Sequence, residues 1–206
     1  YQRLPVTFSH GEGVWLFDTE GKRYLDALCG ISVTNLGHAH PAVSSAIKTQ
    51  ADLLLHTSNL YHITPQQQLA DKLCSIAAMD KVFFSNSGAE AIEAAIKLAR
   101  LHASHKGNSH PIIITMTGSF HGRTLATITA TASQKMKTGF GPLPAGFVYG
   151  EYNNIESAKQ LFAEHGDNIA AVFVEPVQGE GGIHVGDADY LLQLQALCHN
   201  HQALFM

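Results

Sequence analysis

Apolar, strand-like runs alternate with helical stretches over most of the chain, and this alternation constrains the fold more than any other feature. Strand-like runs are expected at 81–84, 112–116, 147–149 and 170–174, with another beginning at Leu204. Helices are expected between them at 88–102, 155–165 and 189–199. Strands that alternate with helices form parallel sheets covered on both faces. The pattern therefore predicts an α/β fold, with a mostly parallel sheet and flanking helices.

The first 41 residues follow a different pattern. Val14–Phe17 and Arg23–Leu25 are expected to pair as a β-hairpin, and a loop rich in turn-forming residues follows. Further helices are expected at 41–55 and 65–79. The change of pattern predicts a boundary, with a hairpin-and-loop segment at 1–41 and the first part of a larger domain at 42–206.

Charge and composition exclude several classes of protein. The chain has 13 Lys and Arg against 17 Asp and Glu, a net charge of -4, which excludes a strongly basic nucleic-acid-binding protein. It has no apolar run of the ~20 residues that span a bilayer, and its first residues do not resemble a signal peptide. Its 3 cysteines are far apart, which argues against a disulfide framework or a zinc knuckle. We expect a cytoplasmic protein without membrane or nucleic-acid partners.

Three polar loops carry the chemistry-bearing residues, and the first begins a helix. Ser87 and Glu90 have the spacing of a helix capping box. Gly88 and Ala89, between them, leave the backbone N–H groups of the first turn unobstructed. Helix N-termini with free N–H groups bind phosphate. On this segment alone, an ordinary capped helix and a phosphate site both remain open.

The second loop, 118–124, follows the strand expected at 112–116. It places an aromatic ring, an imidazole and a guanidinium close together, from Phe120, His121 and Arg123. An aromatic ring can stack on a flat ligand, and an arginine can bind a carboxylate through two parallel hydrogen bonds. The alternative is a turn with a surface arginine.

The third loop, 175–182, follows the strand expected at 170–174. Its glycines permit close approach of the backbone to a ligand, and Glu175 and Glu180 suggest acid–base chemistry. The alternative is a flexible, Gly-rich loop. Ligands of open α/β sheets bind beyond the carboxyl ends of the strands. Three such loops therefore predict one convergent site with a phosphate anchor, a stacking aromatic ring and a carboxylate clamp.

Six segments, in this order, resemble the class III aminotransferases, which use pyridoxal phosphate: 11–18, 21–26, 36–41, 86–91, 120–124 and 175–182. The resemblance covers nearly the whole chain and is closest to members that act on N-acetylornithine. It implies the fold-type I architecture of pyridoxal-phosphate-dependent transferases, which is aspartate aminotransferase-like. It also implies a homodimer with sites at the subunit interface. Residues 1–41 would belong to the small domain, and residues 42–206 to the large, pyridoxal-phosphate-binding domain.

The resemblance also implies roles for individual residues. The cofactor-binding residues would be Ser87, Gly88, Ala89, Phe120 and His121, with the first three at the phosphate and Phe120 stacked on the pyridine ring. Arg123 would bind the substrate α-carboxylate. Glu180 would be the switch glutamate, which pairs with an arginine further along the chain and lets one pocket accept both a δ-amino substrate and glutamate. Glu175 would support these residues from behind. No metal ligands are implied, because His38 and His40 fall in a structural loop of the family.

The resemblance places the covalent half of the site beyond this sequence. The family's Schiff-base lysine, and the aspartate that pairs with the pyridine nitrogen, match no residue here. The chain stops at Met206 within an apolar run. We therefore expect a truncated large domain that holds no catalytic residue and does not transaminate alone. Lys97 is expected to pair with Glu93 on one helix face instead of serving in catalysis.

The reaction expected from the resemblance transfers the δ-amino group of N-acetylornithine to 2-oxoglutarate, in arginine biosynthesis. Other members of the family act on ornithine, 4-aminobutyrate or succinylornithine, and these substrates stay open. An aminomutase of the same fold, which needs no 2-oxo acid, is a further alternative. The last is a non-catalytic truncated domain that binds phosphate ligands. A dinucleotide-binding domain fits poorly, because no G-x-G-x-x-G motif follows a first strand.

Overall fold

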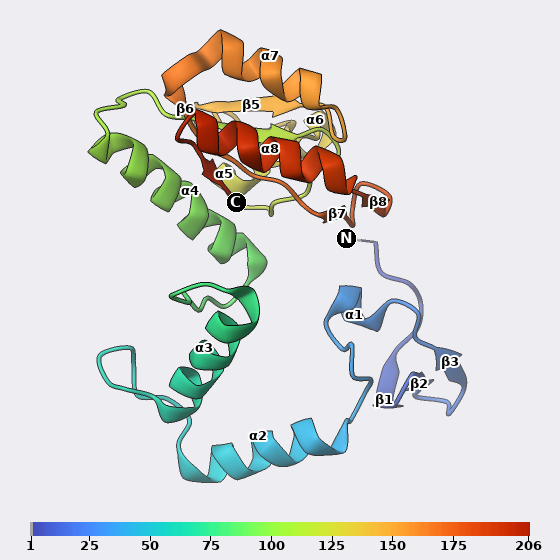
Figure 1. Ribbon diagram of the computed structural model, residues 1–206. Coiled ribbons are helices and arrows are strands. Elements are labelled where there is room, and N and C mark those ends of the chain that lie inside the picture. Colours follow the sequence, from blue (N-terminus) through green and yellow to red (C-terminus); the bar gives the residue numbers. More distant parts are fainter. Residues whose placement is uncertain (1) are drawn as a thin grey trace. The chain divides into compact units, whose positions relative to one another are not determined.

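The computed structural model describes residues 2–206, and residue 1 of the predicted N-terminal segment lies outside them. The chain divides into two compact units, one ending at Lys81 and the other comprising Val82–Met206 (Figure 1). The boundary predicted after residue 41 falls inside the first unit and stays a prediction. Each unit is described by itself.

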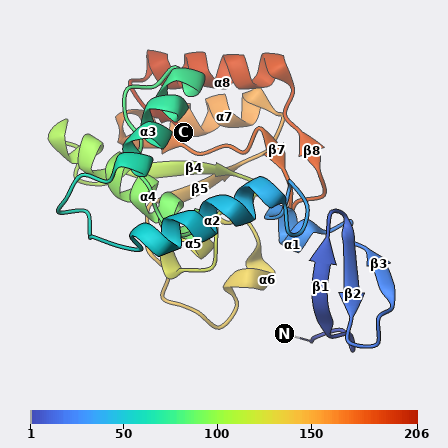
Figure 2. The same ribbon diagram turned by 90° about the horizontal axis from the view of Figure 1, so that it is seen from below.

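The first unit begins with a three-stranded antiparallel sheet (Figure 2). Its strands are β1 (Phe8–Glu12), β2 (Trp15–Asp18) and β3 (Arg23–Leu25), with β2 in the middle. The predicted hairpin is confirmed as β2–β3, and its turn is closed by Asp18, whose Oδ1 accepts the N–H groups of Glu20 and Lys22 at 2.9 and 2.8 Å. Sequence analysis missed β1, because Ser9, His10 and Gly11 give it no apolar alternation.

Helices complete the first unit: α1 (Cys29–Ser32), α2 (Pro41–Leu53) and α3 (Thr64–Ala77). The two predicted helices are confirmed as α2 and α3, each with a proline in its first turn, where the missing N–H costs no hydrogen bond. Neither helix contains a buried residue within the described part of the chain. Their apolar stripes, including Ile47 and Ile76, are exposed.

The second unit contains the predicted parallel sheet. Its strands are β4 (Ile112–Met116), β5 (Phe147–Gly150), β6 (Ile169–Val172) and β9 (Leu204–Phe205), in the spatial order β5-β4-β6-β9, and every adjacent pair is parallel. The strand predicted at 81–84 is wrong, since these residues are irregular and Phe83 is exposed. A strand exists only when a neighbour completes its hydrogen-bond ladder, and in residues 2–206 no strand lies beside this run.

Helices cover both faces of this sheet because successive strand residues point to opposite sides. Ile113 packs with Ile96 and Ala99 of α4 (Gly88–His105) in one buried cluster. Its neighbour Ile114 packs in the other cluster with residues of α7 (Ile155–His165) and α8 (Ala188–Asn200). Figure 2 shows α7 and α8 together on one side of the sheet. The other elements are α5 (Leu125–Ala130), α6 (Gln134–Lys137), η1 (Gly166–Asn168), β7 (Val177–Gln178) and β8 (His184–Val185).

In the described part of the chain, none of the helices has both the length and the apolar character needed to cross a membrane.

Leu194 of α8 tests the importance of this packing. Its side chain is fully buried, whereas Leu192 on the same helix is 63% exposed. Leu194→Ala in the full-length protein is expected to lower the free energy of unfolding by about 2–5 kcal/mol, because it leaves a cavity beside Ile114 and Phe162. Leu192→Ala, the control, is expected to change it by less than about 0.5 kcal/mol. Equal shifts in the denaturation midpoints of the two variants would contradict this view of the core.

Candidate functional site

The first predicted loop forms a capped helix N-terminus. Ser87 is the N-cap of α4, and its Oγ accepts the Glu90 N–H at 3.2 Å. The Glu90 carboxylate reaches back to Asn86, accepting the backbone N–H at 2.6 Å and a side-chain N–H at 3.2 Å. These two bonds to Asn86 hold the pKa of Glu90 below its ordinary value. The N-cap half of the predicted capping box is therefore present, whereas the Glu90 carboxylate bonds to Asn86 in place of the Ser87 N–H.

The start of α4 has room for an anion. The first N–H groups of a helix, here those of Gly88 and Ala89, have no acceptor within the helix and lie at the positive end of its dipole. A Cβ built on Gly88 would meet no atom within 4 Å. Glu90 is turned toward Asn86. This end of α4 therefore fits a phosphate group in both space and polarity.

The second loop lies directly against α4. Gly122 adopts a φ of +133°, which favours glycine, and a Cβ there would lie 3.0 Å from the Ala89 Cβ and 2.5 Å from the Thr127 hydroxyl. The Thr124 hydroxyl donates to the Glu93 carboxylate on α4. This contact replaces the predicted pairing of Glu93 with Lys97. Thr124 also caps α5 through the Thr127 N–H. The residues around Arg123 are thus fastened to the helix with the phosphate-sized space.

The third loop lies against the second. The Phe120 N–H donates to Glu175 Oε2 at 3.1 Å, and Gln178 Nε2 donates to the Thr117 carbonyl at 2.8 Å. A Cβ on Gly181 would come within 2.5 Å of the Gly118 carbonyl oxygen, so only glycine fits there. These contacts confirm that the three loops converge, but only the second and third leave carboxyl ends of strands, since in the described part of the chain no strand directly precedes the first. The assigned roles in binding stay predictions.

Phe120 and Arg123 lie together in the second loop. The Arg123 guanidinium carbon lies 5.5 Å from the centre of the Phe120 ring, which is within cation–π range. Arg123 is exposed and Phe120 is half-buried. The Phe120 ring and the Arg123 guanidinium, a group suited to binding a carboxylate, therefore lie side by side, as predicted from the sequence.

Glu175 is half-buried and Glu180 is exposed. Burial raises the pKa of Glu175 above its ordinary value, and the negative charge of Glu180 adds to this effect. The hydrogen bond from the Phe120 N–H opposes it. Glu175 therefore links the second and third loops through its hydrogen bond with the Phe120 N–H.

His121 has its imidazole inside the protein. The residue is 6% exposed, its ring lies edge-on to Phe173 at 6.2 Å, and its Nε2 has no hydrogen-bond partner among the residues that the structure describes. Burial lowers the pKa of His121 to about 4. Its backbone N–H donates to the Thr131 hydroxyl at 2.9 Å. The predicted contact of His121 with the cofactor stays a prediction.

Sequence analysis missed several residues that hold the loops together. Gln178 was read only as part of a Gly-rich loop, yet its side chain is 2% exposed and bonded to Thr117. Tyr152, after β5, bonds to Glu175 of the third loop, and Asn153 bonds to Val185, three residues after that loop ends. The position of Tyr152 and Asn153 could have indicated this role, because both residues follow the carboxyl end of a strand of the same sheet.

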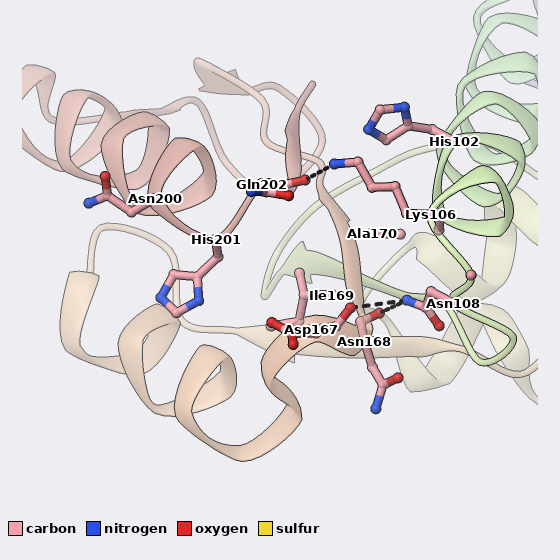
Figure 3. A pocket seen from close by; sticks show the side chains of 12 residues that line it. His102, Lys106, Asn108, Asp167, Asn168, Ile169, Ala170, Asn200, His201 and Gln202 are labelled. Atoms are coloured by element: carbon pink, nitrogen blue, oxygen red, sulfur yellow. Dashed lines mark hydrogen bonds between the residues drawn. The ribbon is translucent and has the colours of Figure 1, made fainter.

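A hollow of about 560 Å³ lies at the opposite end of the sheet, where the strands begin (Figure 3). Figure 3 shows His102 of α4 and Lys106, the residue after α4, near Gln202, whose carbonyl oxygen accepts a hydrogen bond from the Lys106 ammonium group at 2.9 Å. A smaller hollow, of about 340 Å³, lies among the loops and is lined by Thr117, Gly118, Tyr152, Asn153, Gln178, Gly181 and His184. We place the candidate site at the loops, because the open N-terminus of α4, the guanidinium and the two carboxylates lie on these loops.

The sequence of this chain matches the family model for aminotransferase class-III over residues 1–206, and the chain belongs to this family. Among curated proteins, it is 50% identical over 206 residues to the acetylornithine aminotransferase of Nitrosomonas europaea, matching 100% of this chain and 52% of that protein. The chain thus spans about half the length of the curated relatives it matches.

Solved structures give the same result for the fold. The ornithine aminotransferase of Toxoplasma gondii ME49 superposes with a TM-score of 0.93 at 30% identity, over 99% of this chain and 49% of that one. An amine transaminase from an uncultivated Pseudomonas species, solved in its PLP-bound form, gives 0.91 at 27% identity, over 98% and 51%. The predicted fold of the pyridoxal-phosphate-dependent aminotransferases is confirmed.

The buried His121 makes stability depend on pH. In the folded protein its pKa is about 4, against 6.5 for an unperturbed histidine, so below pH 6.5 the unfolded chain binds a proton that the folded chain does not. We expect this group to remove on the order of 3 kcal/mol of stability as the pH falls from 6.5 to about 4.

Denaturant unfolding of the full-length protein at pH 7 and pH 4.5 measures this effect. His121→Gln is expected to show a weaker loss of stability between the two values. His110→Gln, at an exposed histidine, is the control and is expected to keep the parent's pH dependence. The same pH dependence in all three proteins would show that His121 contributes nothing to it.

Proposed function

We propose that this chain supplies the phosphate-binding and carboxylate-binding part of a pyridoxal-phosphate-dependent aminotransferase. The observation that carries the proposal is the convergence of three loops, which brings the open N-terminus of α4 together with Phe120 and Arg123. Membership of the class III family supports the choice of cofactor. When bound, pyridoxal phosphate acts as the electron sink that allows an amino group to be moved.

In this proposal, the chain's residues bind and orient. The N–H groups of Gly88 and Ala89, with Ser87, hold the phosphate at the positive end of α4. The half-buried face of Phe120 packs on the ring of the cofactor. Arg123 binds the α-carboxylate of the substrate through paired hydrogen bonds, which fixes the direction from which the amino group approaches.

The two carboxylates have separate tasks. Glu175 accepts the Phe120 N–H and so fixes the residue that packs on the cofactor. Glu180, exposed on the tip of the third loop, is proposed as the switch that lets the same pocket accept both a δ-amino substrate and glutamate.

We propose N-acetylornithine as the amino donor and 2-oxoglutarate as the acceptor, with glutamate as the product. Identity of 50% to the Nitrosomonas europaea protein, against 30% to the ornithine aminotransferase of Toxoplasma gondii, favours this donor. This places the activity in arginine biosynthesis.

A homodimer in the cytoplasm completes the proposal. The apolar stripes of α2 and α3 are exposed, and a second copy of the chain can cover them. The free thiols of Cys29, Cys74 and Cys198 are consistent with a reducing compartment. Sedimentation equilibrium of the full-length protein tests the dimer, and the mass of a monomer at micromolar concentration would contradict it.

A substrate panel on the full-length protein tests the function. N-acetylornithine is expected to give the highest kcat/KM with 2-oxoglutarate, above ornithine, 4-aminobutyrate and succinylornithine. A higher value for one of the others would reassign the donor, and turnover without a 2-oxo acid would indicate an aminomutase. Absence of a covalent adduct by intact mass, after incubation with pyridoxal phosphate and borohydride, would favour a non-catalytic phosphate-binding domain.

Arg123→Lys tests the carboxylate clamp. Lysine keeps the charge but loses the paired geometry, so kcat/KM for N-acetylornithine is expected to fall by about 100-fold, equivalent to ~3 kcal/mol of charged hydrogen bonding. Pyridoxal phosphate affinity is expected to stay unchanged. The control is Lys97→Ala, at an exposed basic residue of α4. If Arg123→Lys behaves like this control, Arg123 does not bind the substrate.

A further inference from the structure

The hairpin that carries Glu180 is too short to hold its own position. Strands β7 and β8 pair through only Val177 with Val185 and Gln178 with His184, and Glu180 lies on the exposed tip between them. An isolated two-stranded hairpin is marginally stable at best in water. The position of Glu180 therefore depends on the contacts that fasten the two strands to the rest of the protein.

Two consecutive residues after β5 fasten both sides of this hairpin. The Tyr152 hydroxyl donates to the Glu175 carbonyl at 2.8 Å and lies 3.2 Å from the Pro176 carbonyl, just before β7. On the other side, Asn153 Nδ2 donates to the Val185 carbonyl at 3.0 Å, and its Oδ1 accepts the Asp187 N–H at 2.9 Å. These bonds all go to backbone groups, so they fix the path of the hairpin at both ends.

Tyr152 and Asn153 are themselves held firmly. The Tyr152 ring packs edge-on against Tyr190 of α8 at 5.9 Å. Burial, with the negative charges of Glu175 and Asp187, raises the pKa of Tyr152, so its hydroxyl keeps its proton and remains a donor. Asn153 has a φ of +59°, a conformation that asparagine adopts more readily than most residues. The next residue, Asn154, caps α7.

The chain after β8 approaches Tyr152 closely at Gly186. A Cβ on Gly186 would lie 2.8 Å from the Tyr152 hydroxyl, so a larger residue there would displace the Tyr152 side chain. Gln178 adds a third attachment through the Thr117 carbonyl. The hairpin is therefore fixed at its base, with only the tip around Glu180 exposed.

We propose that Tyr152 and Asn153 are positioning residues that hold the Glu180 hairpin in place and thereby set the preference between the two amino donors. This inference rests on the proposed function, in which Glu180 distinguishes a δ-amino substrate from glutamate. A loosened hairpin lets Glu180 sample more positions. N-acetylornithine, which needs Glu180 in place, loses more than glutamate, for which Glu180 moves aside.

Asn153→Gly in the full-length protein tests the proposal. Glycine tolerates the positive φ, so this variant removes the side-chain bonds without straining the backbone. The two half-reactions, with N-acetylornithine and with glutamate, are measured separately by the change in cofactor absorbance. We expect kcat/KM for N-acetylornithine to fall by about 10-fold, as loss of ~1.4 kcal/mol of hydrogen bonding implies, and that for glutamate to fall by less than about 2-fold. The matched control is Gln160→Ala, at an exposed residue of α7.

Glu180→Gln separates failure of the inference from failure of the proposed function. If this variant leaves the ratio of the two half-reactions unchanged, the switch role of Glu180 is wrong. If Glu180→Gln shifts the ratio but Asn153→Gly leaves it unchanged, the positioning role is overturned. The same conclusion holds if Asn153→Gly lowers kcat/KM of both half-reactions equally. Hydrogen exchange supplies a second readout, and faster exchange confined to residues 177–187 is expected in Asn153→Gly. Unchanged exchange there would also overturn the proposal.

Discussion

The parallel pairing of β4 with β5 on one side and β6 on the other is the constraint on which the rest of the second unit depends. It buries Ile113 and Ile114 against helices on opposite faces, and it makes all three strands end at the same edge. The loops that leave this edge have no regular structure of their own beyond the short β7–β8 hairpin. These loops meet because the strands before them end at the same edge of the sheet. A few side-chain hydrogen bonds then hold the loops in position.

Local features of this fold could be predicted from the sequence, whereas contacts between residues far apart in the chain could not. The strand at 112–116 and the five long helices were predictable because apolar periodicity and cap residues are local signals, whereas the short helices α1, α5 and α6 were not predicted. The strand expected at 81–84 fails because ladder formation needs a neighbour, which a local apolar run does not provide. The predicted pairing of Glu93 with Lys97 fails for a similar reason. The helical spacing does not reveal that Thr124, 31 residues away, donates its hydroxyl to Glu93.

The polarity of the site follows from the same arrangement. The positive end of α4 and the Arg123 guanidinium attract anionic groups, whereas Glu175 and Glu180 enter from the third loop. Glu175 is kept from competing for Arg123 by its bond to the Phe120 N–H and by its partial burial, which also raises its pKa. Within residues 2–206, Glu180 has no such hydrogen bond, and its position depends on the hairpin that carries it. The two carboxylates thus differ in burial and in the contacts that hold them.

This difference gives the segment after β5 its importance. Tyr152 and Asn153 bond to the hairpin and Asn154 caps α7, so three consecutive residues join the helix layer to the loop that carries Glu180. None of these bonds involves a substrate group. In the proposed function, substitutions in this segment change which donor is preferred while Arg123 and the start of α4 keep their geometry. Under that proposal, substrate preference and substrate binding are separable because they depend on different loops.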